Sequence, residues 1–346
     1  MVPVLSGLTP KQIASVLELK KPFRSKQIFR WLQNGVTDFF SMTNLPEDFR
    51  KNLSENVPAV STKVNQVITS KDGSVKLQIQ THDNSMIETV ILYDEAGRAT
   101  CCLSSQLGCA VNCGYCKTGS LGFARNLRPD EIVEQVLHAE KHAGKIDNIV
   151  FMGMGEPLHN YQHLFQSIRV LTHPEGRGMS SRRITVSTAG VIPGIRNLAE
   201  DDIQVRLAVS LTSADQKQRE SLIPIAKKYP LHELKSCLQD YQEHFNKRIT
   251  LEMVLLEGIN VNMGQIHALQ EFANGLKVLV NLIPLNEVPG IPFNRPEEKE
   301  IHEFEKNLKK AGLKYTVRKS KGSEVSGACG QLGVLKNSAD PSHPSR

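Results

Sequence analysis

The chain has 346 residues, 40% of them hydrophobic and 23% charged, which is typical of a globular protein that can bury a substantial core. No apolar run is long enough to span a membrane, the N-terminus lacks a secretory signal, and the seven cysteines are odd in number with three clustered, so we expect a cytoplasmic protein without a disulfide framework. The net charge of +6 and the isoelectric point of about 8.9 permit an RNA partner but do not require one.

Residues 1–55 are expected to form a small helical domain. Thr9 can cap a helix over residues 9–18, and a second helix over residues 25–34 carries an apolar face. Basic side chains gather around this second helix and after the third apolar segment: Lys21, Arg24, Lys26, Arg30, Arg50 and Lys51. They form either a solvated face over a helical core or a surface that docks RNA.

The hydrophobic period changes to two between residues 63 and 93. This alternation predicts β-strands, with Asp72-Gly73 as a hairpin turn. We therefore expect residues 56–95 to form a β-extension that links the helical domain to the core.

Beyond residue 98, short apolar runs alternate with longer amphipathic segments, the pattern of βα units around a parallel sheet. Helices are expected over residues 129–143, 231–245, 263–273 and 296–311. Strands are expected at residues 100–105, 146–152, 184–187, 205–211, 250–254 and 278–283. Six such units predict an α/β fold, a partial (β/α)6 barrel over residues 96–320, with its motifs on the loops after the strands. Residues 321–346 should form a loop holding Cys329 and a disordered tail from residue 337.

Three cysteines form the most informative motif of the chain. Cys109, Cys113 and Cys116 have C-x3-C-x2-C spacing on a loop that contains Gly and Asn. Iron–sulfur clusters are commonly held by four cysteines, so three would leave one iron open for a ligand. The alternatives are ordinary buried thiols or a zinc site, although structural zinc usually has four Cys or His ligands and no clear second pair follows downstream.

Short polar residues follow several predicted strands. Gly153 and Gly155 would let the backbone pass close to a ligand, and Glu156 offers a carboxylate to an ammonium group. The segment does not fit a dinucleotide loop, because Leu158 replaces the third glycine. Other strand ends carry polar groups suited to ribose and carboxylate contacts, although each alone could be a cap or turn residue: Ser187, Ser210, Thr212 and Asn286.

The cysteine spacing, with Tyr115 before the third cysteine, resembles the cluster loop of radical S-adenosylmethionine (SAM) enzymes. Residues 104–109 (SSQLGC), 122–127 (GFARNL), 152–158 (MGMGEPL) and 328–332 (ACGQL) resemble the RlmN/Cfr family of RNA adenine methyltransferases, and the likeness runs from about residue 21 to about residue 335. It implies a 4Fe-4S cluster on Cys109, Cys113 and Cys116. It also implies SAM binding by Gly155, Glu156, Ser187, Ser210, Leu211, Thr212 and Asn286. In one departure, Thr212 stands where the family usually has histidine.

The resemblance also implies the catalytic residues. Cys329 would take a methyl group from SAM by displacement, because adenine ring carbons are not nucleophilic enough to do so. A second SAM would provide the radical that activates the S-methyl group. A second thiol, Cys102, would then attack the Cys329 sulfur and release the methyl, while Glu88 would accept the ring proton. Alternation on a strand puts Cys101 and Cys102 on opposite faces, so only one can face the barrel, and the resemblance selects Cys102.

The implied product is 2-methyladenosine in 23S rRNA at the peptidyl-transferase centre, and in tRNA at the adenine 3′ of the anticodon. The base must leave its stack to reach a barrel interior. We expect a monomer that takes electrons from flavodoxin or ferredoxin. The alternatives are Cfr-type methylation of carbon 8, a radical SAM enzyme on a non-RNA substrate, and a non-catalytic RNA-binding protein with a structural metal. Basic residues that could contact phosphates are Arg125, Arg182, Arg183, Lys227, Lys228, Arg318, Lys319 and Lys321.

Overall fold

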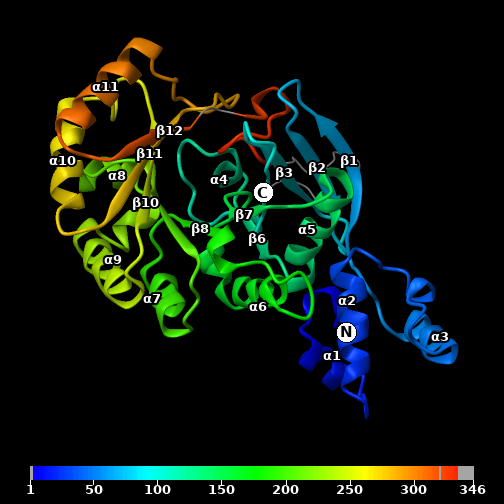
Figure 1. Cartoon of the computed structure of the whole chain (residues 1–346). Coiled ribbons are helices and arrows are strands. Elements are labelled where there is room, and N and C mark those ends of the chain that lie inside the picture. The colour runs from blue at the N-terminus through cyan, green and yellow to red at the C-terminus, as the bar shows by residue number, and fades with distance from the viewer. Residues whose placement is uncertain (1–2, 319–320, 334–346) are drawn as a thin grey trace.

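One mixed sheet of ten strands runs through the molecule (Figure 1). The structure is a computed structural model and describes residues 3–318 and 321–333. The strand order is β1-β2-β3-β4-β7-β8-β9-β10-β11-β12. Neighbouring strands are antiparallel from β1 to β4 and parallel from β4 onward.

The parallel strands form the barrel that the sequence pattern predicts. All six predicted strands are present, and β12 adds a seventh. They are β4 (Ala99–Cys102), β7 (Asn148–Phe151), β8 (Ile184–Thr188), β9 (Arg206–Ser210), β10 (Ile249–Leu255), β11 (Val278–Pro284) and β12 (Tyr315–Val317). In the described part of the chain the order ends at β12 without a return to β4, so the barrel is open. This confirms the partial barrel.

Helices cover the outer side of this curved sheet (Figure 1). Three of them occupy the predicted residues, and the last is shorter than predicted by a few residues. They are α5 (Pro129–Ala143), α6 (Tyr161–Thr172), α7 (Ile192–Glu200), α8 (Gln216–Leu222), α9 (Leu231–Phe245), α10 (Met263–Ala273) and α11 (Glu298–Lys310). At the start of α5, Pro129 sits at N1 and the Glu131 carboxylate accepts the Arg128 N–H at 2.8 Å, which fixes the first turn.

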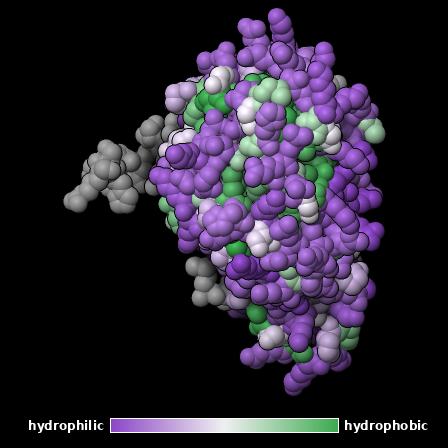
Figure 2. Space-filling model, turned by 90° about the vertical axis from the view of Figure 1, so that its left-hand side faces the viewer, coloured by the Kyte–Doolittle hydropathy of each residue, from purple (hydrophilic) through white to green (hydrophobic). Residues whose placement is uncertain are grey.

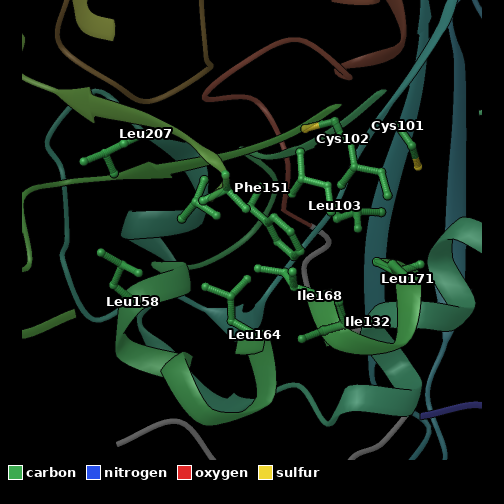
Figure 3. Close-up of a cluster of buried hydrophobic side chains, with 14 of the residues drawn as sticks. Cys101, Cys102, Leu103, Ile132, Phe151, Leu158, Leu164, Ile168, Leu171 and Leu207 are labelled. Carbon is green, nitrogen blue, oxygen red and sulfur yellow. The ribbon is translucent and has the colours of Figure 1, made fainter. Parts of the chain in front are cut away.

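Apolar side chains from α5 and α6 pack against β4 and β7 (Figure 3). Ile132, Leu164 and Leu171 are fully buried, and Phe151 reaches them from β7. This packed layer fixes the strands relative to one another. The polar motifs come directly after the carboxyl ends of these strands.

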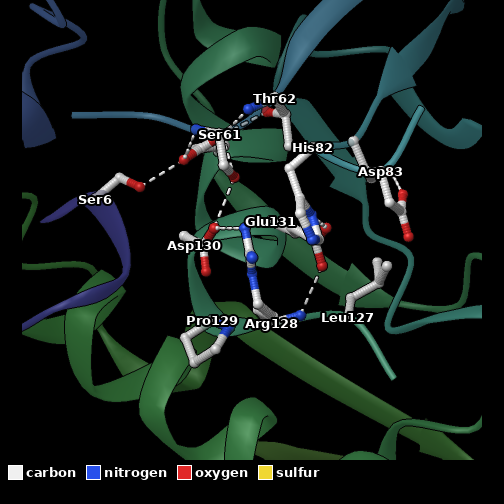
Figure 4. A network of polar contacts seen from close by, with 12 residues as sticks. Ser6, Ser61, Thr62, His82, Asp83, Leu127, Arg128, Pro129, Asp130 and Glu131 are labelled. Atoms are coloured by element: carbon white, nitrogen blue, oxygen red, sulfur yellow. Dashed lines mark hydrogen bonds and ion pairs between the residues drawn. The ribbon is translucent and has the colours of Figure 1, made fainter. Parts of the chain in front are cut away.

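The N-terminal segment is helical, as predicted. Its elements are η1 (Leu5–Gly7), α1 (Pro10–Val16), α2 (Phe23–Gln33), η2 (Phe39–Ser41) and α3 (Glu47–Asn56). Thr9 caps α1 in a capping box with Gln12. Polar contacts attach the segment to α5: Ser6 donates to the Glu134 carboxylate at 2.6 Å, and Ser61 and Thr62 converge on the same helix (Figure 4).

The predicted β-extension is a meander of β1 (Lys63–Thr69), β2 (Val75–Gln80) and β3 (Met86–Tyr93). Gly73 has φ +83° in the β1–β2 turn, and the Gly73 N–H bonds to the Ser70 carbonyl. β3 pairs with β4 through Val90 and Cys102, so the meander belongs to the main sheet. A sequence period cannot reveal this, because strand pairing depends on long-range register.

Shorter elements complete the fold. A two-stranded sheet and short helices flank the cysteine loop and the strand ends: β5 (Gln106–Gly108), α4 (Lys117–Ser120), β6 (Phe123–Asn126), η3 (Pro157–Asn160), η4 (Ser181–Arg183), η5 (Pro224–Lys227) and η6 (Ser323–Val325). The predicted tail from residue 337 lies outside the described residues.

The face in Figure 2 is mostly hydrophilic, with apolar side chains gathered in its middle. In the described part of the chain, no helix has the length and apolar character needed to cross a membrane.

Candidate functional site

The three clustered cysteines lie on the loop between β5 and α4. Three backbone bonds fix this loop: Cys109 N–H to the Gly122 carbonyl at 2.8 Å, Gly114 N–H to Leu222 at 2.9 Å, and Cys116 N–H to Cys113 at 3.1 Å. Gly108 precedes the loop with φ +76°, and a Cβ atom there would stand 1.9 Å from the Gly122 carbonyl oxygen. Glycine is therefore required at the start of the loop.

The cysteines suit a centre that is larger than one ion. Burial raises the pKa of the Cys109 thiol to about 12 and also raises the pKa values of Cys113 and Cys116, so three thiolates need a compensating cation. Among the described residues, no three His, Cys, Asp or Glu side chains converge closely enough to hold one metal ion. Zinc requires sulfur ligands about 2.3 Å from a single centre, whereas in an iron–sulfur cluster each thiolate binds a different iron. The donor set fits the cluster.

A cavity of about 930 Å³, open to solvent, lies between this loop and the strand ends. It is lined by all three cysteines and, among others, by Gly155, Glu156, Ser187, Ser210, Asn286 and Cys329. Most of the predicted cofactor residues therefore share one space with the cysteines.

Glu156 lines this cavity from the loop after β7. It accepts the Ala189 N–H at 2.7 Å and the Leu158 N–H at 3.0 Å, and burial raises its pKa to about 7. Gly155 has φ +97°, and a Cβ atom there would meet Gln106 at 2.4 Å. The glycine thus allows close packing against the neighbouring strand end, in addition to the approach of a ligand.

Glu252 on β10 is a site residue that the sequence analysis missed. Its Oε2 accepts the Ser187 hydroxyl at 2.6 Å, while its buried Oε1 has no hydrogen-bond partner in the described residues. Glu252 lines the cavity, and its unpartnered oxygen makes it a candidate acceptor for a bound molecule. The feature of the sequence that could have identified Glu252 is its charge, inside a predicted strand that is otherwise expected to be buried.

Two of the predicted cofactor residues lie behind the cavity wall. Leu211 is fully buried, and its N–H and that of Thr212 donate to the Glu252 carbonyl at 2.8 and 3.0 Å. The Thr212 hydroxyl pairs with the Tyr115 hydroxyl at 2.9 Å. Neither side chain lines the cavity, which places both as supports of the site.

Cys329 lies where the first cavity meets a second one of about 530 Å³. Both cavities are lined by Cys329, Met152 and Asn286, and the second also by Cys102 and Arg318. The Asn286 side chain donates to the Cys329 carbonyl at 3.0 Å. The segment that carries Cys329 is thus attached to the barrel beside the cysteine loop.

Adjacent cysteines of β4 face different surroundings, and their side chains point apart (Figure 3). Cys102 lines the second cavity, and its pKa is raised to about 12 by burial and by the nearby Cys329. Cys101 is fully buried on the other face, where burial raises its pKa and Glu140 and Arg177 are nearby.

Arg318 is a half-buried residue of the second cavity; the sequence analysis treats it as one of several basic side chains able to reach phosphates. Its pKa is raised chiefly by Cys329 and further by Glu252 and Cys102. Its Nη1 lies 3.5 Å from the Met152 sulfur. The guanidinium of Arg318 therefore lies near both predicted catalytic thiols, Cys102 and Cys329.

Glu88 is buried on β3 and lines neither cavity. Its carboxylate pairs with Lys76 at 3.1 Å and accepts the Gly333 N–H at 2.8 Å. It therefore contacts the C-terminal loop four residues beyond Cys329.

Several of the basic side chains predicted to contact RNA pair with other groups of the protein itself. Arg125 pairs with Asp83 and Glu131, and Lys26 and Arg30 both pair with Glu175. Lys321 donates to the Tyr93 carbonyl, and Arg183 pairs with Asp147 at 3.7 Å. Lys319 lies outside the described residues. Within the described ranges, the exposed side chains that form no ion pair are Lys21, Lys51, Arg182, Lys227 and Lys228.

Comparisons with known proteins show what the chain as a whole is similar to. The Radical SAM superfamily matches residues 103–273, and the Ribosomal RNA large subunit methyltransferase N-terminal domain matches residues 5–58. The "Probable dual-specificity RNA methyltransferase RlmN" of Treponema denticola is 48% identical over 95% of both chains, and that of Syntrophomonas wolfei is 38% identical over 95% of this chain and 96% of its own. The crystal structure of a radical SAM methyltransferase from Sphaerobacter thermophilus superposes with a TM-score of 0.90 at 38% identity, covering 95% of this chain and 98% of the other.

Proposed function

The chain belongs to the RlmN family of radical SAM RNA methyltransferases, and from this membership we propose that it methylates carbon 2 of an adenine in 23S rRNA and of the tRNA adenine 3′ of the anticodon. The observation that carries the proposal is that the cluster cysteines, Glu156 and Cys329 line one cavity, while Cys329 and Cys102 line the adjoining one. The relatives named above are RlmN proteins, so the Cfr-type reaction at carbon 8 is not favoured.

Cys109, Cys113 and Cys116 would hold a 4Fe-4S cluster, and flavodoxin or ferredoxin would provide its electrons to a monomeric enzyme. Glu156 would bind the ammonium group of SAM, and Glu252 would accept a hydrogen bond from its ribose through the unpaired Oε1. When bound, the cluster and SAM supply the methyl group and the radical that removes one hydrogen from an S-methyl group.

The chain's own residues carry the methyl group to the RNA. The Cys329 thiolate displaces it from the SAM sulfonium, which leaves a thioether on Cys329. After hydrogen removal, the carbon attached to Cys329 bonds to the adenine ring, and the adduct then loses the ring proton and one electron, which the cluster would take back. The Cys102 thiolate attacks the Cys329 sulfur, which forms a disulfide and breaks the carbon–sulfur bond, and the released carbon takes up a proton to become the methyl group.

The surroundings of the two thiols support these roles. Arg318 lines the second cavity with them and opposes the rise in the pKa of Cys102. Glu88 is proposed as the acceptor of the ring proton, from its place beneath the loop that carries Cys329.

The proposal is tested by incubating the reconstituted enzyme with a 23S rRNA fragment and, separately, with tRNA, followed by nucleoside mass spectrometry against synthetic standards. We expect 2-methyladenosine from both RNAs. A product that co-migrates with 8-methyladenosine would refute the assigned ring position, and methylation of rRNA alone would refute the dual specificity.

A further inference from the structure

Arg219 is a fully buried charged side chain that the reaction described above does not use. It lies on α8 and is 0% exposed, the bulkiest of the fully buried side chains in the described part of the protein. Arginine is almost never fully buried unless it is paired with an anion. Its partners therefore need an explanation.

The partners of Arg219 are backbone carbonyls only. Nη1 donates to Ser210 at 2.7 Å and also to Leu211, and Nη2 donates to Ala189 at 2.7 Å. Nε has no hydrogen-bond partner, and no carboxylate in the described ranges lies within ion-pair distance of the guanidinium. A buried positive charge that is balanced only by dipoles is costly, and it is retained where an anion can approach.

The anionic groups nearest to Arg219 belong to the cysteine loop. Leu222, one turn further along α8, accepts the Gly114 N–H at 2.9 Å, so this helix packs directly beneath the loop. Burial lowers the pKa of Arg219 to about 10, and Tyr115 and Cys113 oppose that shift. Arg219 does not line the cofactor cavity, so it acts on the loop and not on SAM.

We propose that Arg219 is the buried counter-charge of the iron–sulfur cluster, positioned beneath Cys113 to favour the reduced state. The inference rests on the proposed cluster. A cluster held by three thiolates is anionic, and its reduction adds a further negative charge next to the guanidinium. Because net charge and local electrostatics set cluster potentials, the cation makes the reduction potential less negative.

A purely structural role makes a different prediction. Arg219 also joins the ends of β8 and β9 through Ala189, Ser210 and Leu211, so its loss could simply loosen the cavity wall. Lysine keeps the charge but cannot make three forked bonds, whereas methionine keeps the volume and removes the charge. The two substitutions therefore separate charge from bonding.

The experiment is a potentiometric titration of the reconstituted cluster, without SAM, followed by electron paramagnetic resonance. Wild type, R219K and R219M are compared at equal iron content. The matched controls are R177K and R177M, because Arg177 is also a buried arginine with an unpaired Nε, but it pairs with Glu140 on α5. We expect a midpoint potential shifted to more negative values in R219M, a smaller shift in R219K and none in the controls.

Equal potentials for R219M and wild type would overturn the proposal. So would equal shifts in R219K and R219M, because the change in potential would then come from the lost hydrogen bonds and not from the lost charge. If R219M does not load a cluster, R219K decides the matter: a potential near wild type supports the counter-charge, and a large negative shift overturns it. A wild-type protein that holds no iron would refute the cofactor assignment itself, and a loaded enzyme without 2-methyladenosine would refute only the proposed reaction.

Discussion

Cys329 lies where two cavities meet, and this position gives its thiol two partners in succession. From the first cavity it can receive a methyl group, and in the second it lies with Cys102 and Arg318. The residues on either side are glycine and alanine, and Asn286 holds the Cys329 carbonyl at 3.0 Å. The sulfur can therefore turn between the two spaces while its backbone stays attached.

Glu156 should make SAM binding depend on pH. In the cofactor-free site its pKa is raised to about 7 by burial, so the carboxylate that we propose binds the ammonium becomes protonated as the pH falls through 7. One pH unit below the pKa only about a tenth of the sites are ionised, so the affinity should be about tenfold weaker. Calorimetric titration with SAM under non-reducing conditions between pH 6 and 8 measures this.

The matched variant is E156Q, which keeps the shape of the side chain but cannot ionise. It should bind SAM about 10-fold to 100-fold more weakly, as expected for a lost charge-assisted bond of about 1.5–3 kcal/mol. Its remaining pH dependence reports the titration of SAM and of other groups. The same pH dependence in E156Q and wild type would contradict the role of Glu156.

Cys102 and Cys101 should differ sharply although they are adjacent. C102A removes the thiol that we propose frees the product, so an RNA–protein adduct through the Cys329 carbon should accumulate, visible by denaturing electrophoresis. C101A should turn over, because Cys101 lies on the other face of β4. Adduct in C101A and free product in C102A would reverse the assignment.

At the scale of elements, α5 joins three parts of the molecule. Glu134 accepts the Ser6 hydroxyl at 2.6 Å and the Thr62 N–H at 2.8 Å, both from the N-terminal side of the chain. The next residue, Gln135, accepts the Thr89 hydroxyl of β3 at 2.6 Å and the Ser104 N–H at 2.8 Å. Together with the contacts at Asp130 and Glu131 (Figure 4), these bonds fix the helical segment and the meander to the barrel.

Replacing Glu134 with alanine should loosen the helical segment without disturbing the cofactor site. Several buried donors would lose their acceptor, so the free energy of unfolding should fall by about 2–4 kcal/mol. Hydrogen exchange should increase mainly in residues 5–58, while methylation of Cys329 persists. The control is E55A on the exposed face of α3, and equal stabilities for the two variants would contradict the attachment.

Local signals predict most elements well, because caps and apolar periods lie within each segment. Pro129 and Glu131 mark the start of α5, and its predicted bounds are correct. The sequence pattern does not mark β12 as a strand, because it has only three residues and an exposed centre at Thr316. The pairing of β3 with β4 and the burial of Glu252 and Arg219 depend on contacts between distant segments, which a local pattern does not encode.

For the whole molecule, the exposed cations near the N-terminus should contribute to RNA binding through phosphate contacts. Lys21 and Lys51 are exposed, whereas Lys26 and Arg30 are paired with Glu175. The K21A/K51A double variant should reduce the slope of log affinity against log salt by about 1–2, since each phosphate contact contributes about 0.7–0.9. Filter binding to tRNA from low to moderate salt measures the slope.

The control for this prediction is K299A/K309A, which removes two equally exposed lysines from α11. Its slope should match the wild type. If both double variants reduce the slope equally, the effect reflects net charge and not a docking surface.

The most direct test of the account is mass spectrometry of the Cys329 peptide from protein purified without air and exposed to SAM. The account predicts a mass increase of one methyl group on Cys329, because the methyl group reaches the RNA through this sulfur. An unmodified Cys329, in protein whose cluster is intact, would contradict the thioether intermediate and with it the proposed route to the adenine.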